Sequence, residues 1–107
     1  MKLEDKKCNC ATGNVQRLTP GGIEKLLKQV QGWKVVDGHH LSKEYKFKSY
    51  PSEQFVNQLI AIANEQNHHP DIYLSWGKAR VEIYTHVVDG LSDNDFILAA
   101  KYDAIHK

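Results

Sequence analysis

Two short motifs in the sequence hold residue types that can transfer protons. Together they contain three of the chain's six histidines. The unperturbed pKa of histidine, about 6.5, lets one side chain both donate and accept a proton near neutral pH. If the fold brings the motifs together, these histidines could provide general acid–base catalysis or bind a ligand. The motifs are Asn67-His68-His69-Pro70 and Thr85-His86.

The same histidines allow a simpler interpretation. A histidine pair at the end of a helix can interact only with the last backbone carbonyls, and a histidine at a strand end is usually solvent exposed. From the residues alone, both interpretations stay open. A metal site is the weakest hypothesis, because consecutive residues such as His68 and His69 rarely point at one ion and no acidic or cysteine motif completes a ligand set. We expect His39, His40 and His106 to be exposed and without a role.

Three stretches with helical spacing are expected to position these motifs. Thr19-Pro20 combines an N-cap with proline at the first helical position. Ser92 and Asp95 have the spacing of a helix cap, and the middle stretch turns polar just before the first histidine motif. The expected helices cover residues 20–31, 52–67 and 93–105.

Two pairs of strands are predicted by alternating apolar and polar residues. The first pair flanks Asp37-Gly38 and the second flanks Gly77-Lys78, and both dipeptides favour tight turns. Because the second turn lies about midway between residues 70 and 86, this hairpin is expected to bring the two histidine motifs together. The expected strands cover residues 33–35, 41–48, 72–76 and 80–86.

The expected order of elements, α-β-β-α-β-β-α, cannot give an all-parallel sheet. It predicts an α+β fold with a four-stranded, mostly antiparallel sheet and helices packed on one face. Residues 1–18, which include Cys8 and Cys10, show no stable period. We therefore expect a flexible N-terminal tail with incidental thiols, followed by a single domain over residues 19–107. An exposed sheet edge would also favour pairing between copies of the chain.

The composition narrows the class of protein. With 107 residues and 41% hydrophobic content, the chain can form one compact core. Its formal net charge of +1, from 14 basic and 13 acidic residues, gives no field that would attract nucleic acid or an anionic membrane. The charged N-terminus is not followed by the apolar run of a signal peptide, and no membrane-length apolar run occurs. We expect a soluble cytoplasmic protein that binds neither nucleic acid nor membrane.

Several motifs occur together along the chain at a specific joint spacing. They are Asn67-His68-His69-Pro70-Asp71, Trp76, Tyr84-Thr85-His86, Gly90-Leu91-Ser92 and Asp95. In this combination the chain resembles the pterin-4a-carbinolamine dehydratase family. The likeness extends from Leu18-Thr19 through Gly32-Trp33 to Ala99-Ala100, which is nearly the whole chain.

The resemblance implies a fold, an assembly and a reaction. The fold is the α+β domain described above, assembled as a homodimer or homotetramer. The reaction is that of a hydro-lyase, which removes water from 4a-hydroxytetrahydropterin and yields quinonoid dihydropterin. It belongs to the recycling of the pterin cofactor of an aromatic amino acid hydroxylase, and it uses no metal or organic cofactor. Dehydration needs an acid for the departing hydroxyl and a base for a proton of the pterin ring.

The resemblance also implies roles for individual residues. His68 and His86 are the candidates for proton transfer, and His69 either binds the pterin or shares that task. The residues expected to lie against the substrate are Asn67, Tyr84, Thr85 and Val87.

One position departs from the family pattern. Many relatives carry a glutamate four residues before the first histidine of the pair, where this chain has Asn64. An asparagine can form a hydrogen bond but brings no charge, so the activity or its pH optimum is expected to differ.

A second class of function stays open. Relatives of this fold also act as non-catalytic partners that stabilise dimers of a homeodomain transcription factor. As a protein-binding module of that kind, the chain would stabilise a partner's oligomer and turn over no pterin. The intact histidine set favours the enzyme, because a purely structural partner would not need it.

Overall fold

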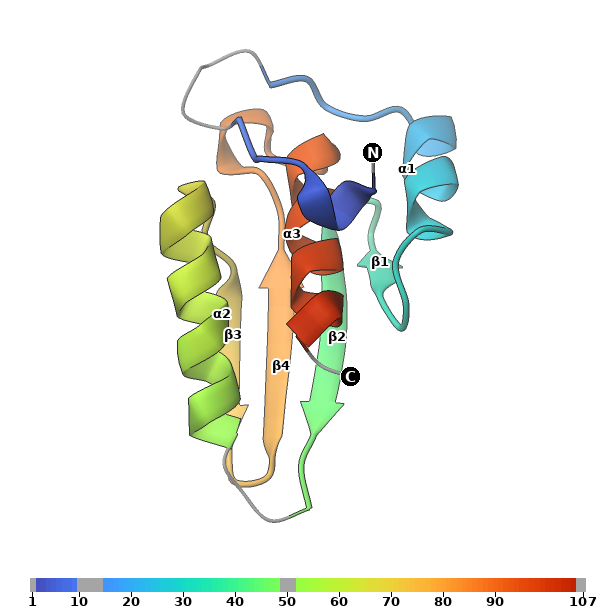
Figure 1. The fold of residues 1–107 in the computed structure, drawn as a ribbon. Coiled ribbons are helices and arrows are strands. Elements are labelled where there is room, and N and C mark those ends of the chain that lie inside the picture. Colours follow the sequence, from blue (N-terminus) through green and yellow to red (C-terminus); the bar gives the residue numbers. More distant parts are fainter. Residues whose placement is uncertain (1, 10–14, 49–51, 106–107) are drawn as a thin grey trace.

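The computed structural model describes residues 2–9, 15–48 and 52–105, and within them the chain forms helices and one four-stranded sheet (Figure 1). The α-helices are α1 (Pro20–Leu27), α2 (Ser52–Gln66) and α3 (Asp93–Ile105). The strands are β1 (Lys34–Val36), β2 (His40–Lys46), β3 (Asp71–Ser75) and β4 (Lys78–Ile83). The short 3₁₀ helices η1 (Leu3–Asp5) and η3 (His86–Val88) flank this arrangement. The predicted order α-β-β-α-β-β-α is confirmed.

The sheet joins the two predicted hairpins through their inner strands. Its strand order is β1-β2-β4-β3, and the pairings are antiparallel. β2 and β4 pair with Leu41 opposite Ile83, and both side chains are fully buried. Figure 1 shows α2 and α3 lying against the same face of the sheet. The predicted α+β fold with helices on one face is therefore confirmed.

Side chains at the predicted positions begin two of the helices. Thr19 Oγ1 accepts a hydrogen bond from the backbone N–H of Gly22 at 3.1 Å. At the start of α3, the Asn94 N–H donates to Ser92 Oγ (3.3 Å), and the Ser92 N–H donates to a carboxylate oxygen of Asp95 (2.9 Å). These bonds satisfy N–H groups that the first turn of a helix leaves without a partner.

Helix α1 ends earlier than predicted, at Leu27 rather than next to Gly32. At Gln31, hydrogen bonds to residues distant in sequence replace the helical ones. The Gln31 N–H donates to Asp103 (3.0 Å), and Lys43 Nζ donates to the Gln31 carbonyl (2.7 Å). Sequence periodicity contains no signal for such long-range bonds, so it overestimates the length of the helix.

The second hairpin turns one residue earlier than predicted. Ser75 pairs with Lys78, so Trp76 and Gly77 form the two-residue turn rather than Gly77-Lys78. Gly77 has a φ of +75°, and a Cβ there would lie 3.2 Å from the Phe47 carbonyl oxygen. Glycine is therefore favoured at the second position of this turn.

Residues 2–9 lie against α3, and here the structure differs from the flexible tail expected over residues 1–18. Leu3 is only 6% exposed and belongs to the hydrophobic core. Lys101 Nζ donates to the Glu4 carbonyl (2.8 Å), and the Cys8 N–H donates to Gln66 Oε1 (2.9 Å). Cys10, like His106, lies outside the described residues.

The core between the sheet and the helices is built from aromatic and branched side chains. Its largest fully buried members include Tyr45, Tyr102, Phe96 and Leu59. Burial raises the pKa of Tyr45 and of Tyr102 well above the usual value, so both phenols stay neutral at physiological pH. Among the described residues, no helix has the length and apolar character needed to cross a bilayer.

Candidate active site

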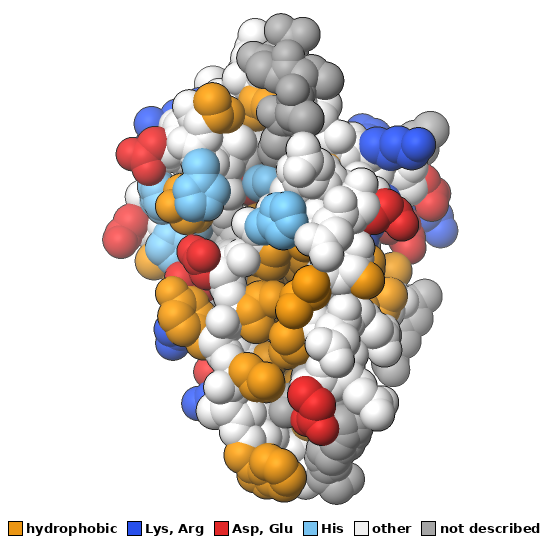
Figure 2. Space-filling view, turned by 90° about the vertical axis from the view of Figure 1, so that its left-hand side faces the viewer, with side chains coloured by type: hydrophobic (Ala, Val, Ile, Leu, Met, Phe, Trp, Pro, Cys, Tyr) orange, Lys and Arg blue, Asp and Glu red, His pale blue; other side chains and the backbone are white. Residues whose placement is uncertain are grey.

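The two predicted histidine motifs line one open pocket of about 270 Å³. The pocket lies where the C-terminal end of α2 approaches η3, at the upper end of the sheet in Figure 1. Figure 2 shows histidine side chains gathered on the upper part of the face formed by α2 and β3. The convergence predicted from the hairpin is therefore present. The lining residues are Asn67, His68, His69, Thr85, His86 and Val87.

Asn67 follows the last residue of α2, and the turn of the backbone there gives the side chains of His68 and His69 different directions. Its φ of +54° lies in the left-handed region, which asparagine tolerates better than most residues. The His68 N–H then donates to the Ala63 carbonyl at 3.1 Å. After this turn His68 is 5% exposed, whereas His69 is exposed to solvent. The pocket thus has one buried ring and one open ring from adjacent residues.

Asp95 is fully buried and forms hydrogen bonds with one residue of each histidine motif, His68 and Thr85. One of its carboxylate oxygens lies 2.7 Å from His68 Nε2. The other oxygen accepts hydrogen bonds from Thr85 Oγ1 and from the Ser92 N–H, each at 2.9 Å. Because a carboxylate only accepts, the His68 ring donates from Nε2. Asp95 therefore decides which ring nitrogen of His68 carries a proton.

The sequence predicts only the capping role of Asp95. That role uses one carboxylate oxygen, while the other binds a histidine 27 residues earlier in the chain. A signal for the second role does exist. The residues after Asp95 are apolar over a full turn of α3, so the aspartate must be buried with them, and a buried carboxylate needs a partner for each oxygen.

Asn64 holds the exposed histidine of the pair. Its Oδ1 lies 2.9 Å from His69 Nε2, and both side chains are accessible to solvent. Asn64 therefore gives His69 a hydrogen-bond partner but brings no negative charge.

His86 belongs to η3 rather than to the end of the predicted strand, because β4 ends at Ile83. The loop that carries it is closed by a hydrogen bond from the Thr85 N–H to the Gly90 carbonyl at 2.8 Å. Thr85 points inward to the buried carboxylate, while His86 stays exposed beside Val87, which is 71% exposed. The pocket therefore offers an apolar surface beside its rings.

Tyr84 is the one predicted substrate-binding residue that is not among the lining residues of the pocket. Its ring centroid lies 4.2 Å from that of His86 and 4.5 Å from that of His39. His39 is not simply exposed, as the sequence predicts, because its Nε2 lies 2.8 Å from Asp89 Oδ1. This hydrogen bond lowers the pKa of Asp89, and the positive charges of His39, Arg17 and His86 add to the effect.

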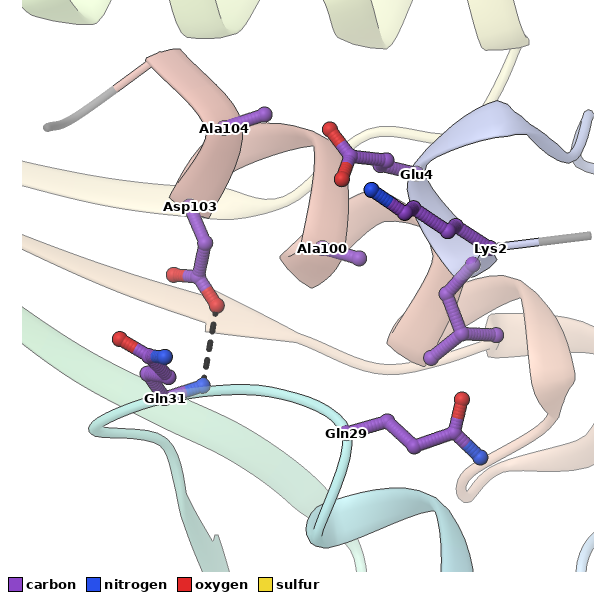
Figure 3. A pocket seen from close by; sticks show the side chains of 8 residues that line it. Lys2, Glu4, Gln29, Gln31, Ala100, Asp103 and Ala104 are labelled. Carbon is purple, nitrogen blue, oxygen red and sulfur yellow. Dashed lines mark hydrogen bonds between the residues drawn. The ribbon is translucent and has the colours of Figure 1, made fainter.

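A larger hollow of about 430 Å³ lies away from the histidines, between η1 and the last turns of α3 (Figure 3). Of its two carboxylates, Glu4 and Asp103, the second accepts hydrogen bonds from the Gln31 N–H (3.0 Å, dashed in Figure 3), Trp33 Nε1 (3.0 Å) and Lys43 Nζ (2.8 Å). These donors connect α3 to β2 and to the segment just before β1. We therefore assign Asp103 a structural role despite the greater volume of this hollow.

In the part of the chain that the structure describes, no three His, Cys, Asp or Glu side chains come together as a set of metal ligands. What the histidine pocket offers is two exposed imidazoles, one buried imidazole paired with a carboxylate, and a threonine hydroxyl. This arrangement suits proton transfer to and from a small polar ligand.

Comparison with known proteins assigns the chain to a family. Residues 16–105 match the family model described as pterin 4 alpha carbinolamine dehydratase. Two relatives carry names that assign them provisionally to pterin-4-alpha-carbinolamine dehydratase. The one from Rubrobacter xylanophilus is 42% identical over 97% of this chain and 98% of its own length, and the one from Rickettsia bellii is 46% identical over 96% and 93%.

A solved structure shows the same fold. It is described as a transcriptional coactivator/pterin dehydratase from Brucella melitensis, with a TM-score of 0.81 and 29% identity over 86% of this chain and all of that chain. The family model, the full-length relatives and the shared fold agree with the histidine pocket, and the chain therefore belongs to the pterin-4a-carbinolamine dehydratase family.

Proposed function

We propose that the chain dehydrates 4a-hydroxytetrahydropterin to quinonoid dihydropterin and so recycles the pterin cofactor of an aromatic amino acid hydroxylase in the cytoplasm. The observation that carries this proposal is the buried pair of Asp95 and His68 in a pocket that also contains His69 and His86. The family to which the chain belongs supports the same activity.

The reaction divides into two proton transfers. The bond from carbon 4a to the hydroxyl oxygen breaks, and an acid protonates that oxygen so that it leaves as water. A base removes a proton from a ring nitrogen, whose electron pair forms the new double bond to carbon 4a. Each well-placed acid or base contributes a factor of about 10² to 10⁴ to the rate.

We assign the base role to His68 and the acid role to His86. Since His68 donates from Nε2 to Asp95, its neutral form carries the lone pair on Nδ1, and the carboxylate stabilises the positive charge that the ring gains as a base. His86 is exposed in the same pocket and can exchange its proton with solvent between turnovers. His69 binds the pterin, with its ring held by Asn64.

The experiment that tests this function follows the dehydration of freshly generated 4a-hydroxytetrahydrobiopterin by ultraviolet absorbance. We expect the wild-type chain to accelerate the reaction well above the uncatalysed rate, with no loss of rate in the presence of a chelator. A wild-type rate equal to the uncatalysed rate would reject the proposed function. A chelator-sensitive rate would reject a metal-free mechanism.

Replacing Asn64 with glutamate is expected to move to higher pH the part of the rate–pH profile that reports pterin binding by His69. The new carboxylate would accept the hydrogen bond from His69 and favour the protonated form of its ring. The profile of kcat/KM between pH 5 and 9 measures the shift. Asn64→Gln, which brings no charge, is the control and should leave the midpoints in place; an equal shift in both variants would show that charge is not the cause.

We also propose that the chain forms a homodimer through β3, or a homotetramer in which such dimers associate. β3 is the last strand in the sheet order, so no described strand pairs with the N–H and C=O groups on its outer edge. Tyr73 and Leu74 on this strand are each 50% exposed, and Trp76 after it is 91% exposed. Figure 2 shows that hydrophobic side chains form a strip down the face that contains α2 and β3. An apolar, unpaired edge of this kind favours pairing with a second copy.

Leu74→Glu is expected to weaken this dimer, because it places like charges close together across the paired edges. Sedimentation velocity over a range of concentrations measures the mass, which should fall from twice that of one chain to that of one chain. Lys34→Glu changes the charge at the opposite sheet edge, on β1, and should leave the dimer intact. A monomeric wild type, or the same loss in both variants, would contradict pairing through β3.

The exposed apolar surface of β3 and α2 also supports a second candidate function, the binding of a partner protein. The Brucella melitensis protein is described as a transcriptional coactivator as well as a pterin dehydratase. The exposed apolar side chains of β3 and α2, which include Ile60 at 44% exposure, could bind a partner protein and stabilise its oligomer. A chain that bound such a partner but turned over no pterin would favour this function over the enzyme.

A further inference from the structure

His39, which comes from the β1–β2 turn, contacts the residues on both sides of His86. Before His86, the Tyr84 ring lies 4.5 Å from the His39 ring, with an angle of 42° between the planes. After it, the Asp89 carboxylate lies 2.8 Å from His39 Nε2. One side chain from a distant turn thus links the two ends of the segment that carries an exposed pocket histidine.

Both links continue to His86 itself. The Tyr84 ring packs against the His86 ring, with centroids 4.2 Å apart and planes tilted by 38°. The backbone N–H of Asp89 donates to the His86 carbonyl at 3.1 Å and closes η3. His86 is therefore held through its ring by Tyr84 and through its backbone by Asp89, and both of these residues contact His39.

The electrostatics favour the same contacts. The hydrogen bond from His39 is the main cause of the lowered pKa of Asp89, and Arg17 and His86 add positive charge nearby. When the His39 ring is protonated, its hydrogen bond to the carboxylate is charge-assisted, and such bonds are shorter and stronger than neutral ones. Asp89 also has a φ of +46°, so the backbone turn that ends η3 depends on a residue that tolerates this conformation.

We propose that His39 and Asp89 form a positioning pair that fixes the place and orientation of His86 in the pocket. The proposal rests on the proposed function, in which His86 is the acid of the dehydration. The pair does not line the pocket, so it acts through Tyr84 and the η3 backbone rather than by contact with the pterin. It therefore supports kcat more than substrate binding, because a small misplacement of a catalytic group is costly in rate.

Two substitutions weaken the bond between His39 and Asp89 and leave the ring contact with Tyr84 in place. His39→Phe keeps an aromatic ring against Tyr84 but loses the bond to Asp89. Asp89→Asn keeps a residue that tolerates the left-handed turn and keeps an acceptor oxygen, but it removes the charge. His40→Ala is the matched control, because its Nδ1 lies 3.1 Å from His39 Nδ1 while neither link to His86 passes through it.

The test combines kinetics with NMR spectroscopy of the folded protein. We expect both variants to lower kcat on the order of 10-fold with little change in KM, and His40→Ala to keep the wild-type kcat. The ring resonances of His86 should shift in both variants and stay in place in the control. In His39→Phe, the titration midpoint of the Asp89 carboxyl should rise toward the usual value for aspartate, because the main cause of its lowered pKa is gone.

The outcomes distinguish this proposal from the proposed function. If the wild type is active while both variants keep its kcat and its His86 resonances, the positioning pair is rejected and the function stands. If the wild type turns over no pterin, the function fails, but the His86 resonances still report whether the pair positions the ring. A loss of kcat with unchanged His86 resonances would assign the effect to general destabilisation and reject the proposal.

Discussion

Replacing Asp95 with asparagine is expected to reduce kcat by a factor of about 10² to 10⁴, as expected for the loss of a catalytic base. The carboxylate accepts from His68 on one oxygen and from Thr85 and the Ser92 N–H on the other. An amide has only one acceptor oxygen, and the backbone N–H of Ser92 cannot become an acceptor. The amide oxygen must therefore face Ser92, so the amide NH₂ faces His68. His68 must then accept on Nε2 and carry its proton on Nδ1, which removes the lone pair of the base.

The same substitution is expected to lower the free energy of unfolding by about 1–3 kcal/mol, because a buried polar network loses one acceptor. Steady-state kinetics and urea unfolding measure the two effects separately. Asp103→Asn is the control, since Asp103 lies in the same helix and also accepts from three donors, away from the pocket. It should lose stability and keep kcat. Equal losses of kcat in both variants would contradict a specific role of Asp95, as would full activity of Asp95→Asn.

Local sequence signals predicted most of the fold. The caps at Thr19 and Ser92 and the turn at Asp37-Gly38 each depend on residues close together in the chain, and the structure places helices and a hairpin there. The α+β arrangement followed from the order of these elements. Errors occurred where a neighbour distant in sequence decides the conformation, as at Gln31, where Asp103 and Lys43 replace helical hydrogen bonds.

The candidate site was also predictable where local signals decide it, and unpredictable where long-range contacts do. The hairpin rule correctly brought His68, His69 and His86 to one pocket, because it needs only the position of the turn. It could not find the contact between His39 and Asp89, since these residues are 50 positions apart and neither belongs to a motif. The burial of Asp95 could have been inferred from its apolar neighbours, but its choice of His68 as a partner depends on how α3 crosses the sheet.

Removing the two proton-transfer histidines should have different consequences for stability and the same consequence for catalysis. His86→Ala and His68→Ala are each expected to lower kcat by a factor of about 10² to 10⁴. His86 is exposed, so its loss should leave the free energy of unfolding nearly unchanged. His68 is 5% exposed and pairs with a fully buried carboxylate, so its loss leaves Asp95 without that partner and should destabilise the fold.

The rate–pH profile assigns acid and base. A reaction that needs one protonated and one neutral group has a bell-shaped profile of kcat/KM, and the loss of either group removes the limb that it controls. We expect His86→Ala to lose the alkaline limb and His68→Ala to lose the acid limb. Imidazole added to the assay should restore part of the rate of His86→Ala, because that side chain leaves an opening at the pocket surface, and less of the rate of His68→Ala, whose position is buried. If the limbs are exchanged, His68 is the acid and His86 the base; if both variants keep a bell-shaped profile, the proton transfers belong to other groups.

In the double variant the loss should be smaller than the product of the two single losses, because a base without its acid no longer completes the reaction.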